Sequence, residues 1–190
     1  MKLTLIKPTI GRREHSLYVD EGRMEPLMLG VLAALTPPDV EAVLHDDRME
    51  AIPYDTPTDL VAITVETYTA RRAYEIAAEY RQRGVPVILG GMHVALLPEE
   101  AAQHADSIFV GDAETGWAQV IADARQGKLR PRYDAPAGVA QMGGVIPRRD
   151  LFAGKGYLPI TLMQFSRGCR FACNYCAVSP YFGNRHHVRR

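Results

Sequence analysis

Three cysteines occur in this chain, and all of them lie in one short stretch near its end, "SRGCRFACNYCAV". They are Cys169, Cys173 and Cys176, in the spacing C-x-x-x-C-x-x-C. Thiolates bind soft metals, so this spacing predicts a loop that wraps around zinc or an iron–sulfur cluster. A structural zinc needs a fourth ligand, which His186 or His187 could supply. A cubane cluster held by three cysteines instead leaves one iron open to an exogenous ligand.

The composition describes an ordinary globular protein without a strong global charge. An odd number of thiols in one cluster argues against a disulfide framework, so we expect reduced cysteines and a cytoplasmic location. Lys and Arg number 22, as do Asp and Glu, so no net field steers the chain toward nucleic acid or an acidic membrane. No apolar run approaches the roughly 20 residues that a membrane span needs.

The residues that precede the cysteines alternate short apolar runs with amphipathic stretches. Five strands are predicted, at residues 2–6, 40–44, 60–65, 85–91 and 107–110. Helical patterns begin near Pro26, Thr69, Pro98 and Asp112, the last of which is a candidate helix cap. This order favours an α/β fold, a flavodoxin-like doubly wound parallel five-stranded sheet with strand order 2-1-3-4-5.

The amino-acid pattern of the chain changes twice after the last of these strands. Residues 1–130 are predicted to form the α/β domain. Proline and glycine punctuate residues 131–159, which we interpret as a linker. Residues 160–190 begin a second domain, with an apolar strand at residues 160–165 that runs directly into the cysteines.

The cysteine stretch resembles the cluster-binding signature of radical S-adenosylmethionine (radical SAM) enzymes. Gly168 before the first cysteine and Tyr175 before the last belong to the same pattern. The resemblance implies that Cys169, Cys173 and Cys176 hold a four-iron four-sulfur (4Fe-4S) cluster whose open iron binds S-adenosyl-L-methionine. It also implies that Tyr175 packs beside the adenine, and that an electron donor of flavodoxin or ferredoxin type is a partner.

The same resemblance implies a catalytic partial (β/α) barrel that begins at the strand before the cysteines. Only twelve residues follow Val178, too few for the later barrel strands. The chain is therefore interpreted as the N-terminal portion of a longer enzyme, incomplete and inactive alone.

The α/β domain resembles the cobalamin-binding class of that superfamily. In open parallel sheets, ligands bind at the carboxyl ends of the strands, near the switch in strand order. The resemblance places the cobalamin contacts at those ends, on Thr64, Glu66, Gly90, Gly91, His93, Gly111 and Glu114. The glycine pair would let the backbone approach the nucleotide tail. The D-x-H-x-x-G motif is absent from the chain, so no cobalt-bound histidine from that motif is expected.

The sequence thus predicts the N-terminal part of a cobalamin-dependent radical SAM enzyme. Methyl transfer or radical rearrangement on a small-molecule or lipid-like substrate is the expected reaction. One alternative is a methylthiotransferase, although the three further cysteines of that family are missing here. Another is a non-catalytic zinc-binding or nucleic-acid-binding module that uses the basic end "RHHVRR", although a nucleic-acid partner is not otherwise expected.

Overall fold

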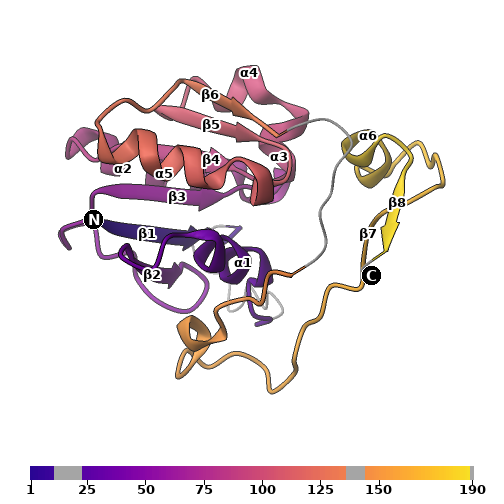
Figure 1. Ribbon diagram of the computed structural model, residues 1–190, viewed down its shortest axis with the longest axis horizontal. Helices are drawn as coiled ribbons and strands as arrows, with labels where there is room; N and C mark the ends of the chain where they lie inside the picture. The colour runs from indigo at the N-terminus through magenta and orange to yellow at the C-terminus, as the bar shows by residue number, and fades with distance from the viewer. Residues whose placement is uncertain (11–22, 136–143, 189–190) are drawn as a thin grey trace, which may run out of the picture.

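The computed structural model describes residues 1–10, 23–135 and 144–188. A parallel sheet with helices on both faces forms its larger part, the sheet domain. An extended segment leads from it to a small C-terminal unit, residues 164–188 (Figure 1). The strands of the sheet are β1 (Lys2–Lys7), β2 (Glu41–Asp46), β3 (Leu60–Thr64), β4 (Val87–Gly90), β5 (Ser107–Val110) and β6 (Arg132–Asp134).

The strand order is β2-β1-β3-β4-β5-β6, and every neighbouring pair is parallel. The α/β class and the predicted order 2-1-3-4-5 are confirmed for the first five strands. The sixth strand, β6, was not predicted and lies inside the expected linker. It has three residues, too few to show a periodic pattern, and it forms because β5 offers a free edge for pairing.

The burial of each strand follows its place in the sheet. All five residues of β3 are buried, as expected for a central parallel strand covered on both faces. β2 lies at the edge, and its burial alternates along the strand. Continuous apolar runs in the sequence therefore mark the centre of the sheet.

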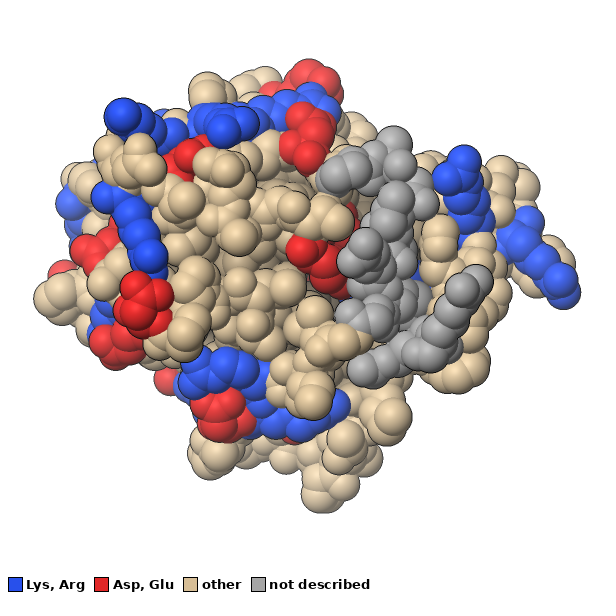
Figure 2. Space-filling model, viewed as in Figure 1, with Lys and Arg blue, Asp and Glu red and all other residues tan. Residues whose placement is uncertain are grey.

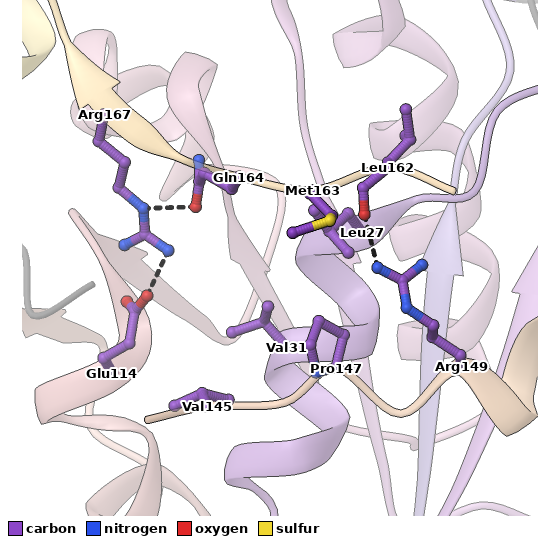
Figure 3. Close-up of a pocket in the computed structure, with 10 residues that line it drawn as sticks. All are labelled: Leu27, Val31, Glu114, Val145, Pro147, Arg149, Leu162, Met163, Gln164 and Arg167. Carbon is purple, nitrogen blue, oxygen red and sulfur yellow. Dashed lines mark hydrogen bonds and ion pairs between the residues drawn. The ribbon is translucent and has the colours of Figure 1, made fainter. Parts of the chain in front are cut away.

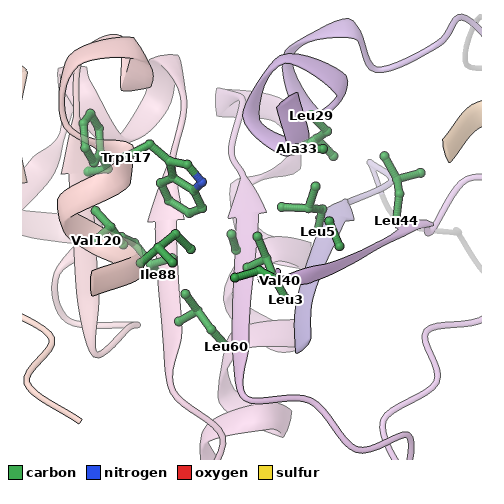
Figure 4. Packing of buried hydrophobic residues seen from close by; sticks show 14 of the residues in the cluster. Leu3, Leu5, Leu29, Ala33, Val40, Leu44, Leu60, Ile88, Trp117 and Val120 are labelled. Carbon is green, nitrogen blue, oxygen red and sulfur yellow. The ribbon is translucent and has the colours of Figure 1, made fainter. Parts of the chain in front are cut away.

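Helices cover both faces of the sheet and form two hydrophobic cores. On one face α1 (Leu27–Leu35) and α5 (Trp117–Arg125) pack on β1, β3 and β4; Figure 4 shows Leu29 and Ala33 beside Leu5, and Trp117 and Val120 beside Ile88. On the other face lie α2 (Ala70–Gln82), α3 (Met92–Leu96) and α4 (Pro98–Ala101). Two single-turn 3-10 helices, η1 (Thr67–Thr69) and η2 (Ala113–Thr115), follow the carboxyl ends of β3 and β5.

The C-terminal part differs from the predicted start of a barrel. After the 3-10 helix η3 (Arg149–Phe152), residues 160–165 form no strand. The strand that does form is β7 (Ser166–Gly168), which pairs antiparallel with β8 (His186–Val188), with α6 (Val178–Phe182) between them. An extended segment becomes a strand only where a neighbouring strand pairs with its backbone, and no strand in the described ranges pairs with residues 160–165. A radical SAM barrel is thus not shown. None of the helices in the described ranges is long and apolar enough to cross a membrane.

Candidate functional site

A pocket of about 490 Å³ opens at the carboxyl edge of the sheet, where β3, β4 and β5 end. The residues predicted to contact a ligand that do line it are Thr64, Glu66, Gly90, Gly91, Gly111 and Glu114. Sequence reasoning located this edge because the carboxyl ends of parallel strands lie together.

The apolar wall of the pocket comes from two helices that sequence reasoning did not assign to the site. α1 contributes Leu27, Met28, Leu29, Val31, Leu32 and Leu35, and Phe109 and Trp117 stand at the end of β5 and the start of α5. An apolar lining with few polar groups is typical of sites for small molecules and cofactors. The signal was present in the sequence, since α1 reads "LMLGVLAAL" and is apolar on nearly every side.

The two glycines at the end of β4 have different surroundings. Gly91 has φ +106°, and a Cβ there would lie 2.7 Å from the carbonyl oxygen and 2.9 Å from the amide nitrogen of Val65. A Cβ on Gly90 would meet nothing closer than 3.8 Å. Gly91 is therefore required by the close approach of the chain's own backbone, whereas Gly90 has room for a side chain.

His93 does not line the pocket with the other predicted residues. It is 3% exposed and contacts Tyr74 Oη at 3.1 Å, Thr67 Oγ1 at 3.3 Å and Glu100 Oε1 at 3.3 Å. These partners belong to α2, η1 and α4, on the opposite face of the sheet from α1. The hydrogen bond from Tyr74, followed by that with His93, lowers the pKa of Glu100. In this structure His93 joins three elements together.

A buried ion pair lies beside the pocket, where β1 and β3 separate. Lys7 Nζ pairs with Glu66, and the Lys7 side chain is only 7% exposed. The amide of Glu66 donates to Thr69 Oγ1 at 3.1 Å, which holds the turn after β3 in place. The positive charge of Lys7 therefore partly neutralises the charge of Glu66 on the pocket wall.

The C-terminal unit forms the outer wall of the same pocket through Gln164, Arg167, Tyr181 and Phe182. Arg167 contacts Asp112 Oδ2 at 3.0 Å and Glu114 Oε1 at 2.5 Å, and Tyr181 Oη donates to Asp112 Oδ1 at 3.1 Å. Asp112, the predicted helix cap, makes no capping hydrogen bond through its side chain. Burial acts to lower the pKa of Arg167, but the hydrogen bond and charge of Glu114 outweigh it, and the pKa is raised.

A second, smaller cavity of about 60 Å³ adjoins this wall (Figure 3). Figure 3 shows Arg167 reaching Glu114 and Gln164, while Arg149 donates to the carbonyl oxygen of Leu162 at 2.5 Å. On the face that carries α1 and α5, charges of both signs surround a broad area without them (Figure 2).

The three cysteines are not joined in disulfides, and in this conformation they do not assemble a metal site. Cys169 and Cys176 are partly buried, Cys173 is exposed, and none forms a disulfide. Among the residues that the structure describes, no three His, Cys, Asp or Glu side chains stand close enough to hold a metal. His186 and His187, in β8, are covered by the same finding. Tyr175, the predicted adenine contact, is 87% exposed. Three thiols suit a soft metal chemically, yet the loop in this conformation does not bring them together.

Comparison with known proteins finds methyltransferases. The chain is 38% identical over 184 residues to bacteriochlorophyllide d C-8(2)-methyltransferase of Chlorobaculum tepidum, covering 90% of this chain and 40% of the relative. It is 29% identical to bacteriochlorophyllide d C-12(1)-methyltransferase of the same organism, over 99% of this chain and 42% of the relative. An uncharacterised methyltransferase of Pyrococcus horikoshii is 26% identical, over 87% of this chain and 44% of the relative. No family model matches.

The names of these relatives contradict the predicted family. The relatives are named as methyltransferases, two of them for bacteriochlorophyllide d, and none is named as a cobalamin-binding radical SAM enzyme. The names of the relatives do not support cobalamin-dependent radical chemistry, the electron donor that it required, or either alternative class. The relatives' names agree with the predicted methyl transfer. The chain spans about two fifths of the length of these relatives.

Proposed function

We propose that this chain is part of a methyltransferase that moves a methyl group from S-adenosylmethionine to a carbon of a small, largely apolar ring compound, of the kind that bacteriochlorophyllide represents. The observation that carries this proposal is the 38% identity to a bacteriochlorophyllide methyltransferase over 90% of the chain. The pocket supports it, because a volume of about 490 Å³ lined largely by apolar side chains suits a substantial part of a planar macrocycle.

The residues of this chain bind and orient the ligand in this proposal. α1, Phe109 and Trp117 offer an apolar wall for the ring. Gly90, which carries no side chain, allows the ring or its substituents to approach β4 closely. Glu66, Glu114 and Arg167 form the polar part of the lining and fix the orientation of the ligand's polar groups. S-adenosylmethionine supplies the methyl group.

Fluorescence of Trp117 tests the binding site directly, because Trp117 is the single tryptophan of the chain and lines the pocket. Titration with bacteriochlorophyllide d should quench its emission with a saturable curve. The Gly90→Val variant, which fills the pocket without backbone strain, should weaken that binding more than tenfold. Ala102→Val, at an exposed position outside the pocket, should bind as the wild type does.

Two further titrations separate the possible occupants. If S-adenosylmethionine alone quenches Trp117, the pocket holds the methyl donor and the assignment to the ring substrate is wrong. If hydroxocobalamin binds in preference to bacteriochlorophyllide d, the pocket holds a corrinoid. If none of the three binds at high micromolar concentration, the pocket is not a ligand site.

We also propose that Cys169, Cys173 and Cys176 together bind one soft metal centre when it is supplied. Three thiolates within eight residues are the observation that favours it. Metal analysis after anaerobic addition of iron and sulfide, or of zinc, identifies the centre. Cys173→Ser should lose the metal, and Ser166→Ala should retain it. Full metal content in Cys173→Ser would contradict the proposal.

A further inference from the structure

Four polar side chains join the sheet domain to the C-terminal unit, beside the packing of α6 against α3. Arg167, 12% exposed, lies between the carboxylates of Asp112 and Glu114. Tyr181 Oη donates to the Asp112 oxygen that Arg167 does not contact. Each oxygen of Asp112 thus receives its own donor, from residues 55 and 69 positions away.

The position of these residues along the chain links two parts of the proposed site. Asp112 and Glu114 follow the carboxyl end of β5 and stand on the pocket wall. Arg167 is in β7, two residues before Cys169, and Tyr181 is in α6, five residues after Cys176. The contact therefore fixes the chain on both sides of the cysteine loop.

The charges explain why the contact depends on Arg167. Without it, two carboxylates would stand close together on the rim of an apolar pocket, where poor solvation makes like charges repel strongly. A guanidinium can donate to both at once, which an ammonium group does less well. Burial of the Tyr181 ring raises the pKa of its hydroxyl, and the charge of Asp112 raises it further, so the hydroxyl stays protonated as a donor.

We propose that Asp112, Glu114, Arg167 and Tyr181 are positioning residues that hold β7 and α6, and with them the two ends of the cysteine loop (residues 169–176), against the mouth of the pocket and close it. All four also line the pocket, so a bound ligand touches the side chains that hold the loop. Ligand binding and loop docking are coupled for this reason: a filled pocket favours the docked loop, and a docked loop slows release of the ligand. The identity of that ligand rests on the function proposed above, but the docking contact does not.

Hydrogen exchange of the full 190-residue chain without ligand tests the docking contact. Arg167→Gln should speed amide exchange in residues 166–188 at least tenfold and leave exchange in β1 and β3 unchanged. Arg170→Gln is the matched control, because Arg170 is an exposed arginine of the same segment whose guanidinium lies over the ring of its neighbour Phe171, 5.5 Å from the ring centroid. Equal exchange in both variants would overturn the proposal, as would an equal rise in β1 and β3.

The charge variants refine this test and keep it decisive. Glu114→Gln combined with Arg167→Gln should loosen residues 166–188 no more than Arg167→Gln alone, because the two share one interaction. Arg167→Lys should give an intermediate result. If Arg167→Gln does not fold, Tyr181→Phe and Glu114→Gln must each loosen the segment, and protection unchanged in both variants would overturn the proposal.

Release kinetics test the coupling to the pocket. Bacteriochlorophyllide d should dissociate at least fivefold faster from Arg167→Gln than from Arg170→Gln. The recovery of Trp117 fluorescence measures the dissociation rate. The association rates of the two variants should be similar. Equal dissociation rates would overturn the coupling. If wild-type chain does not bind bacteriochlorophyllide d at all, the proposed ligand fails, and hydrogen exchange alone then decides whether the four residues hold the loop.

Discussion

The indole N–H of Trp117 donates a buried hydrogen bond of 2.9 Å to Oγ1 of Thr36, 81 residues away in the sequence. The Thr36 hydroxyl in turn donates a hydrogen bond to the carbonyl oxygen of Leu32 at 2.9 Å, so the pair of bonds joins the start of α5 to the end of α1. These two helices supply much of the apolar wall of the pocket. The separation of the helices, and with it the width of the pocket, is therefore fixed by a polar contact within the core.

Removing this contact should destabilise the fold measurably. Thr36→Val keeps the shape of the side chain but leaves the indole N–H without an acceptor in a buried position. The expected loss is about 1–3 kcal/mol in the free energy of unfolding, measured by urea denaturation. Thr56→Val, at an exposed position, is the control and should change stability by less than about 0.5 kcal/mol. A loss in Thr36→Val no larger than the control's would contradict the role of this bond.

The two glycines that end β4 should respond differently to the same substitution. Gly91→Ala puts a Cβ 2.7 Å from a backbone oxygen at a residue with positive φ, so it should lose more than about 1 kcal/mol of stability. Gly90→Ala meets only ordinary contacts and should retain stability. Thermal unfolding of the two variants side by side makes the comparison. Equal melting temperatures would show that the backbone at Gly91 can move away.

Removing one partner of the Lys7–Glu66 ion pair should destabilise the fold more than removing both charges. Lys7→Met leaves the Glu66 carboxylate without its partner at a half-buried position, with an expected loss of about 2–4 kcal/mol. Lys7→Met combined with Glu66→Gln removes both charges and should lose less than the single change. Urea denaturation measures both, with the exposed Lys128→Met as the control. A double variant less stable than the single one would show that the pair contributes in another way.

His45 should make the folded chain sensitive to mild acid. Burial in β2 lowers the pKa of His45 from its usual value of 6.5, and this outweighs the opposite effect of Glu50. Below 6.5 the unfolded chain therefore takes up a proton that the folded chain resists, so stability should fall as the pH drops from 7 toward the lowered pKa.

His45→Gln should remove that part of the pH dependence, because glutamine does not titrate. Urea midpoints at several pH values between 7 and 5 measure the slope in both proteins. Carboxylates other than Glu50, whose pKa the charge of His45 helps to lower, contribute equally to the two, so the difference between the slopes belongs to His45 and its pairing with Glu50. Parallel slopes would contradict the prediction.

The class of fold and the edge of the sheet where the pocket opens were predictable from local patterns. Continuous apolar runs such as residues 60–65 identify strands buried on both faces, and the helices between them require parallel pairing. The sequence alone then places Gly90, Gly91 and Glu114 at the carboxyl edge, because they lie at or just after the ends of predicted strands. Strand β6 and the unpaired state of residues 160–165 were missed, because a short or extended segment becomes a strand only through its neighbour.

The sequence by itself determined the α/β sheet, the order of its first five strands and the spacing of the three cysteines, because hydrophobic periodicity, the alternation of strands with helices and residue spacing can all be read along the chain. Only the tertiary structure decided which side chains meet. It placed His93 between α2 and α4 instead of in the pocket, and it gave Asp112 two partners from the C-terminal unit instead of a helix end to cap. Contacts between residues 55 or more positions apart depend on the path of the whole chain, and no local pattern carries that information.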